Sequence, residues 1–153
     1  MLMIRPIVRS DVGEVIALIT ETLREFGLTF GQGLIIDDEL RDLPGAYTER
    51  GGMFWVAARH SEVWGTCGVF PLAPGVFELR KMYLRPNTRG LGLGKKLLVT
   101  AIEWCREHGG TQLVLDTVEE MTAAIGFYEA HGFVRDDAQI RGSRCTRGYS
   151  LAL

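Results

Sequence analysis

Three strand-like segments follow one another in the middle of the chain with only short turns between them. They are rich in Val, Phe, Trp and Tyr, which strands favour, and the connecting residues HSE and APG suit turns. The segments are MFWVAARH from Met53, EVWGTCGVF from Glu62 and VFELRKMYL from Val76. Consecutive segments of this kind pair readily, so they predict an antiparallel meander of three strands.

Helix-like and strand-like segments alternate on both sides of this meander. Apolar residues at positions 12, 15, 16, 19, 23 and 26 recur at helical spacing after Ser10 or Asp11, either of which can cap a helix. The remaining pattern predicts strands at 3–8, 112–117, 133–140 and 146–153, and helices at 37–43, 92–108 and 121–131. Pro44, Gly109 and Gly132 fit the ends of these three helices. The order of elements predicts a mixed α/β fold.

The third strand of the meander contains an irregularity. Its apolar residues are Phe77 and Leu79, then Met82 and Leu84, so the period of two shifts by one residue between Leu79 and Met82. A β-bulge explains such a shift and would leave backbone groups near it available to a ligand. A frayed strand end at the adjacent Arg80 and Lys81 explains the pattern equally well.

Three glycines, Gly90, Gly92 and Gly94, stand at alternate positions where the helix of residues 92–108 begins. Glycines there let successive backbone N–H groups converge, and the helix dipole adds positive charge, so the stretch suits an anionic phosphate. Arg89 and Lys95 add full charges. The spacing fits neither the dinucleotide-binding fingerprint nor the P-loop, and a tight strand-to-helix connection is the alternative explanation.

Composition excludes several classes of protein. With 153 residues, 46% hydrophobic and 24% charged, we expect one globular domain over 1–153. The formal net charge is −2 and the basic residues are scattered, so nucleic acid is not an expected partner. The three cysteines, Cys67, Cys105 and Cys145, are widely spaced in apolar patterns and indicate neither disulfides nor a metal site. Early charges and the lack of a long apolar run predict a cytoplasmic protein without a membrane partner.

Two motifs resemble the GNAT superfamily of N-acetyltransferases. The stretch RGLGLG at 89–94 matches R-x-x-G-x-G, the acyl-CoA pyrophosphate loop of that family, and ELRKMYL before it resembles the family's bulged fourth strand. Downstream, AAIGFYEAHGF at 123–133 resembles A-x-x-x-Y-E-x-x-G-F, in which a tyrosine faces the thioester sulfur. The resemblance extends over residues 53–133.

The resemblance implies the GNAT fold, a twisted and mostly antiparallel sheet that splays between its fourth and fifth strands, with helices on both faces and acetyl-CoA in the gap. By position, backbone groups of Met82, Tyr83 and Leu84 would hold the pantetheine arm, and Tyr128 would protonate the leaving thiolate. The residues implied to cradle the pyrophosphate are Arg89, Gly90, Leu91, Gly92, Leu93, Gly94 and Lys95. Met121 stands where many members have Asn, and Glu119 or Thr122 could replace that Asn.

Acetyl transfer to an amine also needs a base, because an amine with a pKa near 10 is only about a thousandth neutral at pH 7. Glu78, a few residues before the expected pantetheine contacts, is the candidate, acting through a water molecule. The alternative is a structural glutamate paired with Arg80. Tyr128 likewise has an alternative role as a core tyrosine.

The residues and the resemblance together predict an acetyl-CoA-dependent N-acetyltransferase that acts on a primary amine of a small molecule, peptide or protein. The alternative is an inactive acyl-CoA-binding sensor, which would have no need of a proton donor such as Tyr128. Acidic residues at 37–39 could attract a cationic amine or could simply complement a helix dipole. The sequence leaves the acceptor open, and also whether the protein is a monomer or a homodimer.

Overall fold

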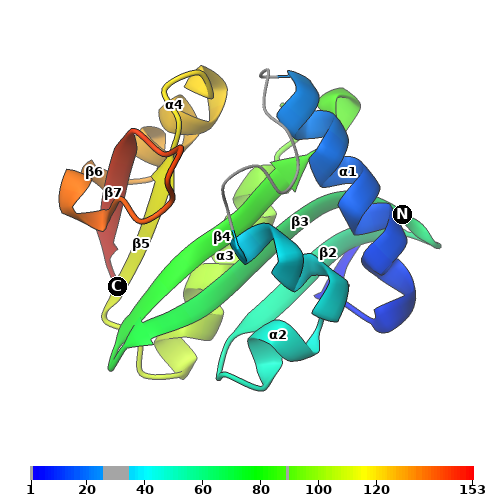
Figure 1. Ribbon diagram of the computed structural model, residues 1–153, viewed down its shortest axis with the longest axis horizontal. Coiled ribbons are helices and arrows are strands. Elements are labelled where there is room, and N and C mark those ends of the chain that lie inside the picture. The colour runs from blue at the N-terminus through cyan, green and yellow to red at the C-terminus, as the bar shows by residue number, and fades with distance from the viewer. Residues whose placement is uncertain (1, 26–34, 89) are drawn as a thin grey trace.

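The computed structural model describes residues 2–25, 35–88 and 90–153, apart from the side chains of 35–38 (Figure 1). The strands are β1 (Met3–Pro6), β2 (Met53–Arg59), β3 (Glu62–Ala73), β4 (Val76–Leu84), β5 (Gln112–Thr117), β6 (Val134–Arg135) and β7 (Arg147–Ala152). The α-helices are α1 (Val12–Glu25), α2 (Gly45–Thr48), α3 (Leu93–Glu107) and α4 (Thr122–Ala130), and the 3-10 helices are η1 (Arg9–Asp11), η2 (Ile35–Asp42), η3 (Pro86–Thr88) and η4 (Asp137–Gln139). In the described part of the chain, no helix is long and apolar enough to cross a membrane.

Within the described residues, seven strands form one sheet in the order β1-β2-β3-β4-β5-β7-β6. The β4–β5 pair is parallel, whereas the other neighbouring pairs are antiparallel. The predicted meander is confirmed as β2, β3 and β4. So is the predicted fold class, a mixed and mostly antiparallel sheet.

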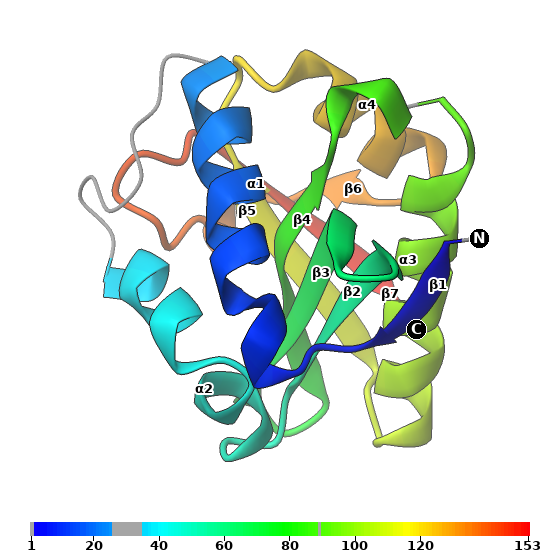
Figure 2. The ribbon, with the colours of Figure 1, turned by 90° about the vertical axis from the view of Figure 1, so that its right-hand side faces the viewer.

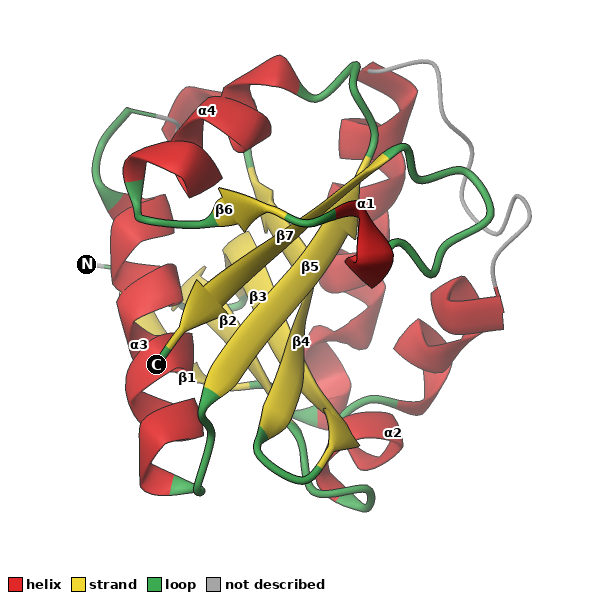
Figure 3. Ribbon diagram, turned by 90° about the vertical axis from the view of Figure 1, so that its left-hand side faces the viewer, coloured by secondary structure: helices red, strands yellow, loops and turns green. Residues whose placement is uncertain are grey.

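Helices cover both faces of this sheet, as Figures 2 and 3 show. Alternation along β2 divides its side chains between two cores. Trp55 packs in a core with Leu97 and Leu98 of α3, while Phe54 packs in a core with Ile19 of α1. Full burial of each large apolar side chain contributes about 1.5–3 kcal/mol, so both layers hold the sheet rigidly beneath the site.

The sheet splays between β4 and β5. These strands pair only from Val76 to Glu78 on β4, opposite Gln112 to Val114 on β5, and then diverge (Figure 1). β4 continues to Leu84 and stays paired with β3. The edge of β4 that faces β5 is therefore no longer covered by a strand beyond Glu78.

The predicted bulge is confirmed, and the frayed-end explanation is wrong. Thr66 pairs with Tyr83 and Gly68 pairs with Arg80, so two residues of β4 lie opposite one of β3. Lys81, the first of the two, has a φ of 55°. The Thr66 hydroxyl donates a hydrogen bond of 2.6 Å to the Lys81 carbonyl and so holds the bulge in place.

Three predicted elements differ from the structure. The helix predicted at 37–43 is present and ends before Pro44, as expected, but it is the 3-10 helix η2; after a cis Leu43–Pro44 bond the chain forms α2, which the pattern did not predict. The strand predicted at 133–140 is only β6, since Asp136 accepts a hydrogen bond from Ala138 N and begins η4. The first strand ends at Pro6, and the Val8 N–H donates to the Asp11 carboxylate instead of to a strand.

Candidate active site

Two cavities lie in the gap where β4 leaves β5. One, of about 410 Å³, is lined by the glycine stretch and the end of β4, and we call it the loop cavity. The other, of about 390 Å³, is lined by ionisable side chains of β4, β5 and residues 141–145, and we call it the charged cavity. Both are lined by Met82, Tyr83, Met121, Ala124 and Tyr128. The two cavities therefore adjoin at Tyr128.

The glycine stretch shapes one wall of the loop cavity. Gly90 and Gly92 have φ values of 85° and 81°, which only glycine adopts without strain, and Gly92 is the residue that precedes α3. A Cβ atom on Gly94 would lie 3.2 Å from a methyl group of Leu84 and 3.5 Å from the ring of Phe127. The glycines thus combine a left-handed turn with close packing of α3 against β4 and α4.

Backbone N–H groups at the start of α3 are available to an anion. The helical bond nearest to this end runs from Lys96 N to Gly92 O (3.2 Å), so the N–H groups of Leu93, Gly94 and Lys95 have no partner within the helix. Such groups carry the positive end of the helix dipole. The Lys95 side chain adds a charge at the wall of this cavity.

The residues predicted for pyrophosphate binding divide into three groups. Gly90, Gly92, Gly94 and Lys95 line the loop cavity. The side chain of Leu91 is 73% exposed and that of Leu93 packs in the core, so only the backbone of these two could contribute. Arg89 lies outside the described residues. Met82, Tyr83 and Leu84, predicted to bind pantetheine, line the loop cavity along the uncovered edge of β4.

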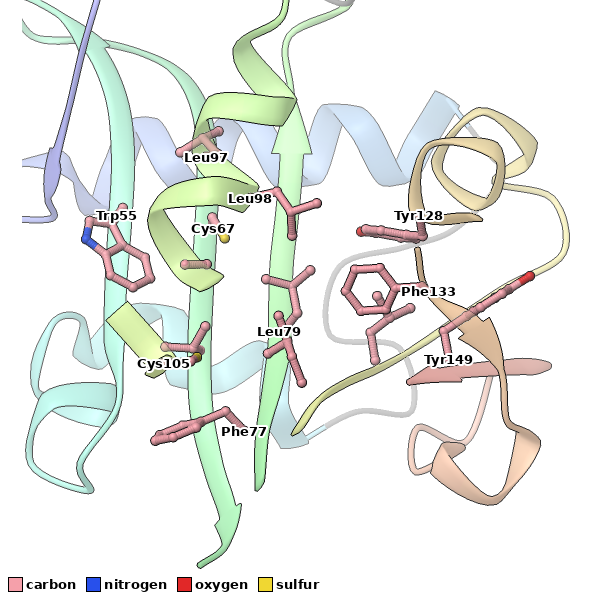
Figure 4. Close-up of a cluster of buried hydrophobic side chains, with 14 of the residues drawn as sticks. Trp55, Cys67, Phe77, Leu79, Leu97, Leu98, Cys105, Tyr128, Phe133 and Tyr149 are labelled. Carbon is pink, nitrogen blue, oxygen red and sulfur yellow. The ribbon is translucent and has the colours of Figure 1, made fainter. Parts of the chain in front are cut away.

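Tyr128 extends from α4 toward β4, as Figure 4 shows. Its ring packs edge-on against Phe127 and Phe133, with centroids 5.7 and 5.5 Å away. Its hydroxyl makes no hydrogen bond with any residue that the structure describes. Burial raises the pKa of Tyr128 well above the usual value near 10, so the hydroxyl keeps its proton at neutral pH and can donate it. Both features proposed for Tyr128, core packing and a donor facing the site, are present.

Glu78 lies on β4, buried, in the wall of the charged cavity. Arg80 Nε donates a hydrogen bond to Glu78 Oε1, and Arg80 Nη1 lies 3.1 Å from Glu39 Oε2. The Arg80 guanidinium also stacks 4.0 Å from the centroid of the Phe70 ring. On the other side, Arg141 Nη1 lies 3.9 Å from Glu78 Oε2. Glu78 thus faces the cavity while each of its oxygens forms an ion pair with an arginine, a close one with Arg80 and a longer one with Arg141.

Sequence reasoning missed the segment 141–145, which supplies the far wall of the charged cavity. Asp116 on β5 anchors it, because one carboxylate oxygen accepts hydrogen bonds from the N–H groups of Arg141 and Gly142, both 2.7 Å long. Cys145 in this wall is not a nucleophile at neutral pH, since burial raises the pKa of its thiol to about 12. The segment carries no sequence motif. Only its position along the chain, just before the strand that pairs with β5, could have suggested that it lies near the site.

Met121 lines both cavities, at the position where the family often has Asn. Glu119 pairs with Arg147 at 3.3 Å, and Thr122 is exposed; neither lines these two cavities. Of the acidic residues at 37–39, Glu39 reaches the site only through Arg80, and the side chains of Asp37 and Asp38 lie outside the described ones.

The arrangement has close parallels among known proteins. The model of the "Acetyltransferase (GNAT) family" matches residues 14–133. The N-acetyltransferase YjgM of Escherichia coli is 35% identical over 137 residues, which are 87% of this chain and 82% of that protein. The N-acetyltransferase C1271.07c of Schizosaccharomyces pombe is 35% identical over 81% of this chain and 77% of that protein.

Solved structures agree in fold. An acetyltransferase of the GNAT family from Staphylococcus aureus superimposes with a TM-score of 0.91 at 26% identity, over 99% of both chains. A PaiA N-acetyltransferase from Thermoplasma acidophilum, solved in complex with coenzyme A, superimposes with a TM-score of 0.77 at 19% identity, over 100% of this chain and 99% of that one.

Proposed function

Because the chain belongs to the GNAT family and is an N-acetyltransferase, we propose that it moves the acetyl group of acetyl-CoA to a primary amine of a small molecule or protein. The observation that carries this proposal is the position of Tyr128 between two cavities of different character. One cavity offers backbone N–H groups that have no partner within α3 and a strand edge that no longer pairs with β5. The other offers a buried carboxylate. A donor and an acceptor could therefore meet beside one protonated hydroxyl.

On the donor side, the pyrophosphate would lie against the N–H groups that precede Lys96 and beside the Lys95 ammonium. The pantetheine arm would run along Met82, Tyr83 and Leu84, where β5 no longer pairs with β4. The Thermoplasma protein, which shares this fold, was solved in complex with coenzyme A, and this supports coenzyme A as the ligand. Met121 offers a thioether there in place of an amide, so the arm would gain an apolar contact and no hydrogen bond from that side chain.

On the acceptor side, the amine would occupy the charged cavity. Its ammonium form would lose one proton to Glu78 through a water molecule, and the neutral nitrogen would attack the thioester carbonyl. The C–N bond forms and the C–S bond breaks. The Tyr128 hydroxyl gives its proton to the departing thiolate, and the proton released from the new amide nitrogen replaces it.

The direct test is a panel of amines and peptides incubated with acetyl-CoA while free coenzyme A thiol is followed. We expect acceptor-dependent thiol release and an acetylated product by mass spectrometry. Binding of acetyl-CoA by calorimetry, with no thiol release on any acceptor, would instead identify an acyl-CoA-binding module. Failure to bind acetyl-CoA at all would remove the proposal entirely.

A further inference from the structure

The described side chains that line the charged cavity carry more positive than negative charge. Four are cationic and two are carboxylates. The cations are Arg80, Lys81, Arg141 and Arg144, and the carboxylates are Glu78 and Asp116. A cavity meant for a simple amine, which is itself a cation before it reacts, would be expected to have the opposite balance.

Among the described side chains whose contacts with the cavity wall are known, the balance of charge stays on the positive side. Glu39, which pairs with Arg80 from outside the cavity wall, raises the carboxylates to three against four cations. One Asp116 oxygen is occupied by the two backbone N–H groups of the segment 141–145. Residues 26–34, which the structure does not describe, contain no ionisable side chain and so leave the balance unchanged.

Arg141 is the cation best placed to meet a ligand. Its guanidinium donates to two neutral oxygens of Gln139, the backbone carbonyl at 2.9 Å and Oε1 at 3.0 Å. Its side chain is 41% exposed, so a ligand in the cavity can reach it. A planar guanidinium held in this way presents its remaining N–H groups in a fixed direction, which suits a carboxylate.

Arg141 and Glu78 place opposite charges side by side in one cavity, with 3.9 Å between Arg141 Nη1 and Glu78 Oε2. A ligand whose amine and carboxylate are attached to the same carbon could set its ammonium against Glu78 and its carboxylate against Arg141. We propose that the acceptor is an α-amino acid or a close analogue, and that Arg141 determines this specificity. The inference rests on the proposed function in that it takes the charged cavity as the acceptor's site.

The test compares amino acids with their own carboxamides, for example methionine, phenylalanine and glutamine with methioninamide, phenylalaninamide and glutaminamide. Each pair shares its side chain and differs at the carboxylate. We expect kcat/KM to be about 10- to 100-fold higher for the acid, the range of one charge-assisted hydrogen bond. The amide has the less basic amine, so a larger fraction of it is neutral at pH 7, and this bias acts against the expected result.

Arg141→Gln should bring the ratio of kcat/KM for the acid to kcat/KM for the amide close to one. Arg141→Lys should restore part of the preference for the acid. Arg135→Gln is the matched control, because Arg135 pairs with Asp137 on the surface and lines neither cavity. It removes the same charge and should leave the ratio unchanged.

Calorimetry with coenzyme A present separates this inference from the proposed function. Tighter binding of the acids that depends on Arg141, without any thiol release, would support the ligand class and the role of Arg141 while the proposed acetyl transfer fails. Equal or better use of the amides in turnover, equal or tighter binding of the amides, or binding of neither member of a pair would overturn it.

Discussion

Tyr128 allows the chemistry to be separated from binding at a single oxygen atom. Tyr128→Phe keeps the ring that packs against Phe127 and Phe133 and removes only the hydroxyl. We expect kcat to fall about 100-fold, the low end for a positioned general acid, because a thiolate with a pKa near 8.5 partly leaves unaided. Acetyl-CoA affinity should change little. Steady-state thiol release and calorimetry measure the two effects.

Tyr149→Phe is the control for this change. Tyr149 is also buried, but its hydroxyl donates to Glu129 at 2.8 Å and it lines neither cavity. This variant should keep kcat. If Tyr128→Phe also keeps kcat within about threefold, while product release is shown not to limit turnover, Tyr128 is a core residue and not the acid.

Glu78 should affect the rate in a way that depends on pH. Glu78→Gln removes the base, and we expect kcat/KM to fall about 100-fold near pH 7. The loss should shrink as the pH approaches the pKa of the acceptor amine, because much of the amine is then already neutral in solution and needs no base in the protein. A pH series from 7 to 9.5 measures this change in slope.

The ion pair with Arg80 calls for a control, since Glu78→Gln also disturbs it. Glu39→Gln weakens the other partner of Arg80 without changing the cavity wall. It should alter the rate by a constant factor at every pH. A loss in Glu78→Gln that is equally uniform would show that Glu78 positions the acceptor and does not take its proton.

At the residue level, the sequence names residues that line the loop cavity better than those peculiar to the charged cavity. Tyr128 and the glycines lie in contiguous motifs, which the resemblance to the GNAT family identified; their roles stay predictions. Arg141 reaches the cavity because Asp116, 25 positions earlier, holds its backbone N–H. Spacing along the chain carries no information about such a contact.

Among the elements, the start of α3 allows a test with two nearly identical side chains. Gly92 has a φ of 81° with open space around its Cβ position, and both Asn and Asp tolerate that conformation. Gly92→Asp should bind acetyl-CoA about tenfold more weakly than Gly92→Asn, because a carboxylate would repel the pyrophosphate. Calorimetry at two salt concentrations measures the difference, which should narrow at high salt.

The unliganded proteins should show the opposite order. A carboxylate at a helix N-terminus stabilises the helix by about 0.3–1 kcal/mol, so Gly92→Asp should unfold at a higher urea concentration than Gly92→Asn. Equal acetyl-CoA affinity in both variants would mean that the glycine stretch is only a turn.

Element boundaries follow from the sequence where one local cause acts. The shift from Leu79 to Met82 reports the bulge because apolar side chains must stay on the core faces of β4. Before Pro44, helical spacing predicts a helix at 37–43, and the structure has a helix that ends at Asp42 but is of the 3-10 type. The helix α2 that follows Pro44 has only four residues, too few for a helical period to reveal it.

For the whole molecule, buried thiols predict a loss of stability in alkali. Burial raises the pKa of Cys105 from 9.0 to about 12 and also raises that of Cys67. Above pH 9 the unfolded chain loses these protons while the native protein keeps them, so the free energy of unfolding falls as pH rises. We expect a loss of about 1 kcal/mol per thiol between pH 9 and 10 in urea denaturation.

The double variant Cys67→Ala, Cys105→Ala isolates this effect. It should be less stable at pH 7 because it leaves cavities in the core, yet its stability should depend less on pH between 9 and 10. An unchanged pH dependence would assign the alkaline loss to other groups.

The two cavities share residues of β4 and α4, but each also has a wall of its own. The wall peculiar to the loop cavity includes the glycine stretch, where Gly90 and Gly92 are constrained by backbone geometry and Gly94 by close packing. The wall peculiar to the charged cavity includes residues 141–145, attached to β5 through backbone N–H groups that any residue except proline provides. If the charged cavity is the acceptor's site, as proposed, substitutions in that segment would change which amine is acetylated while the loop cavity and Tyr128 stay as they are.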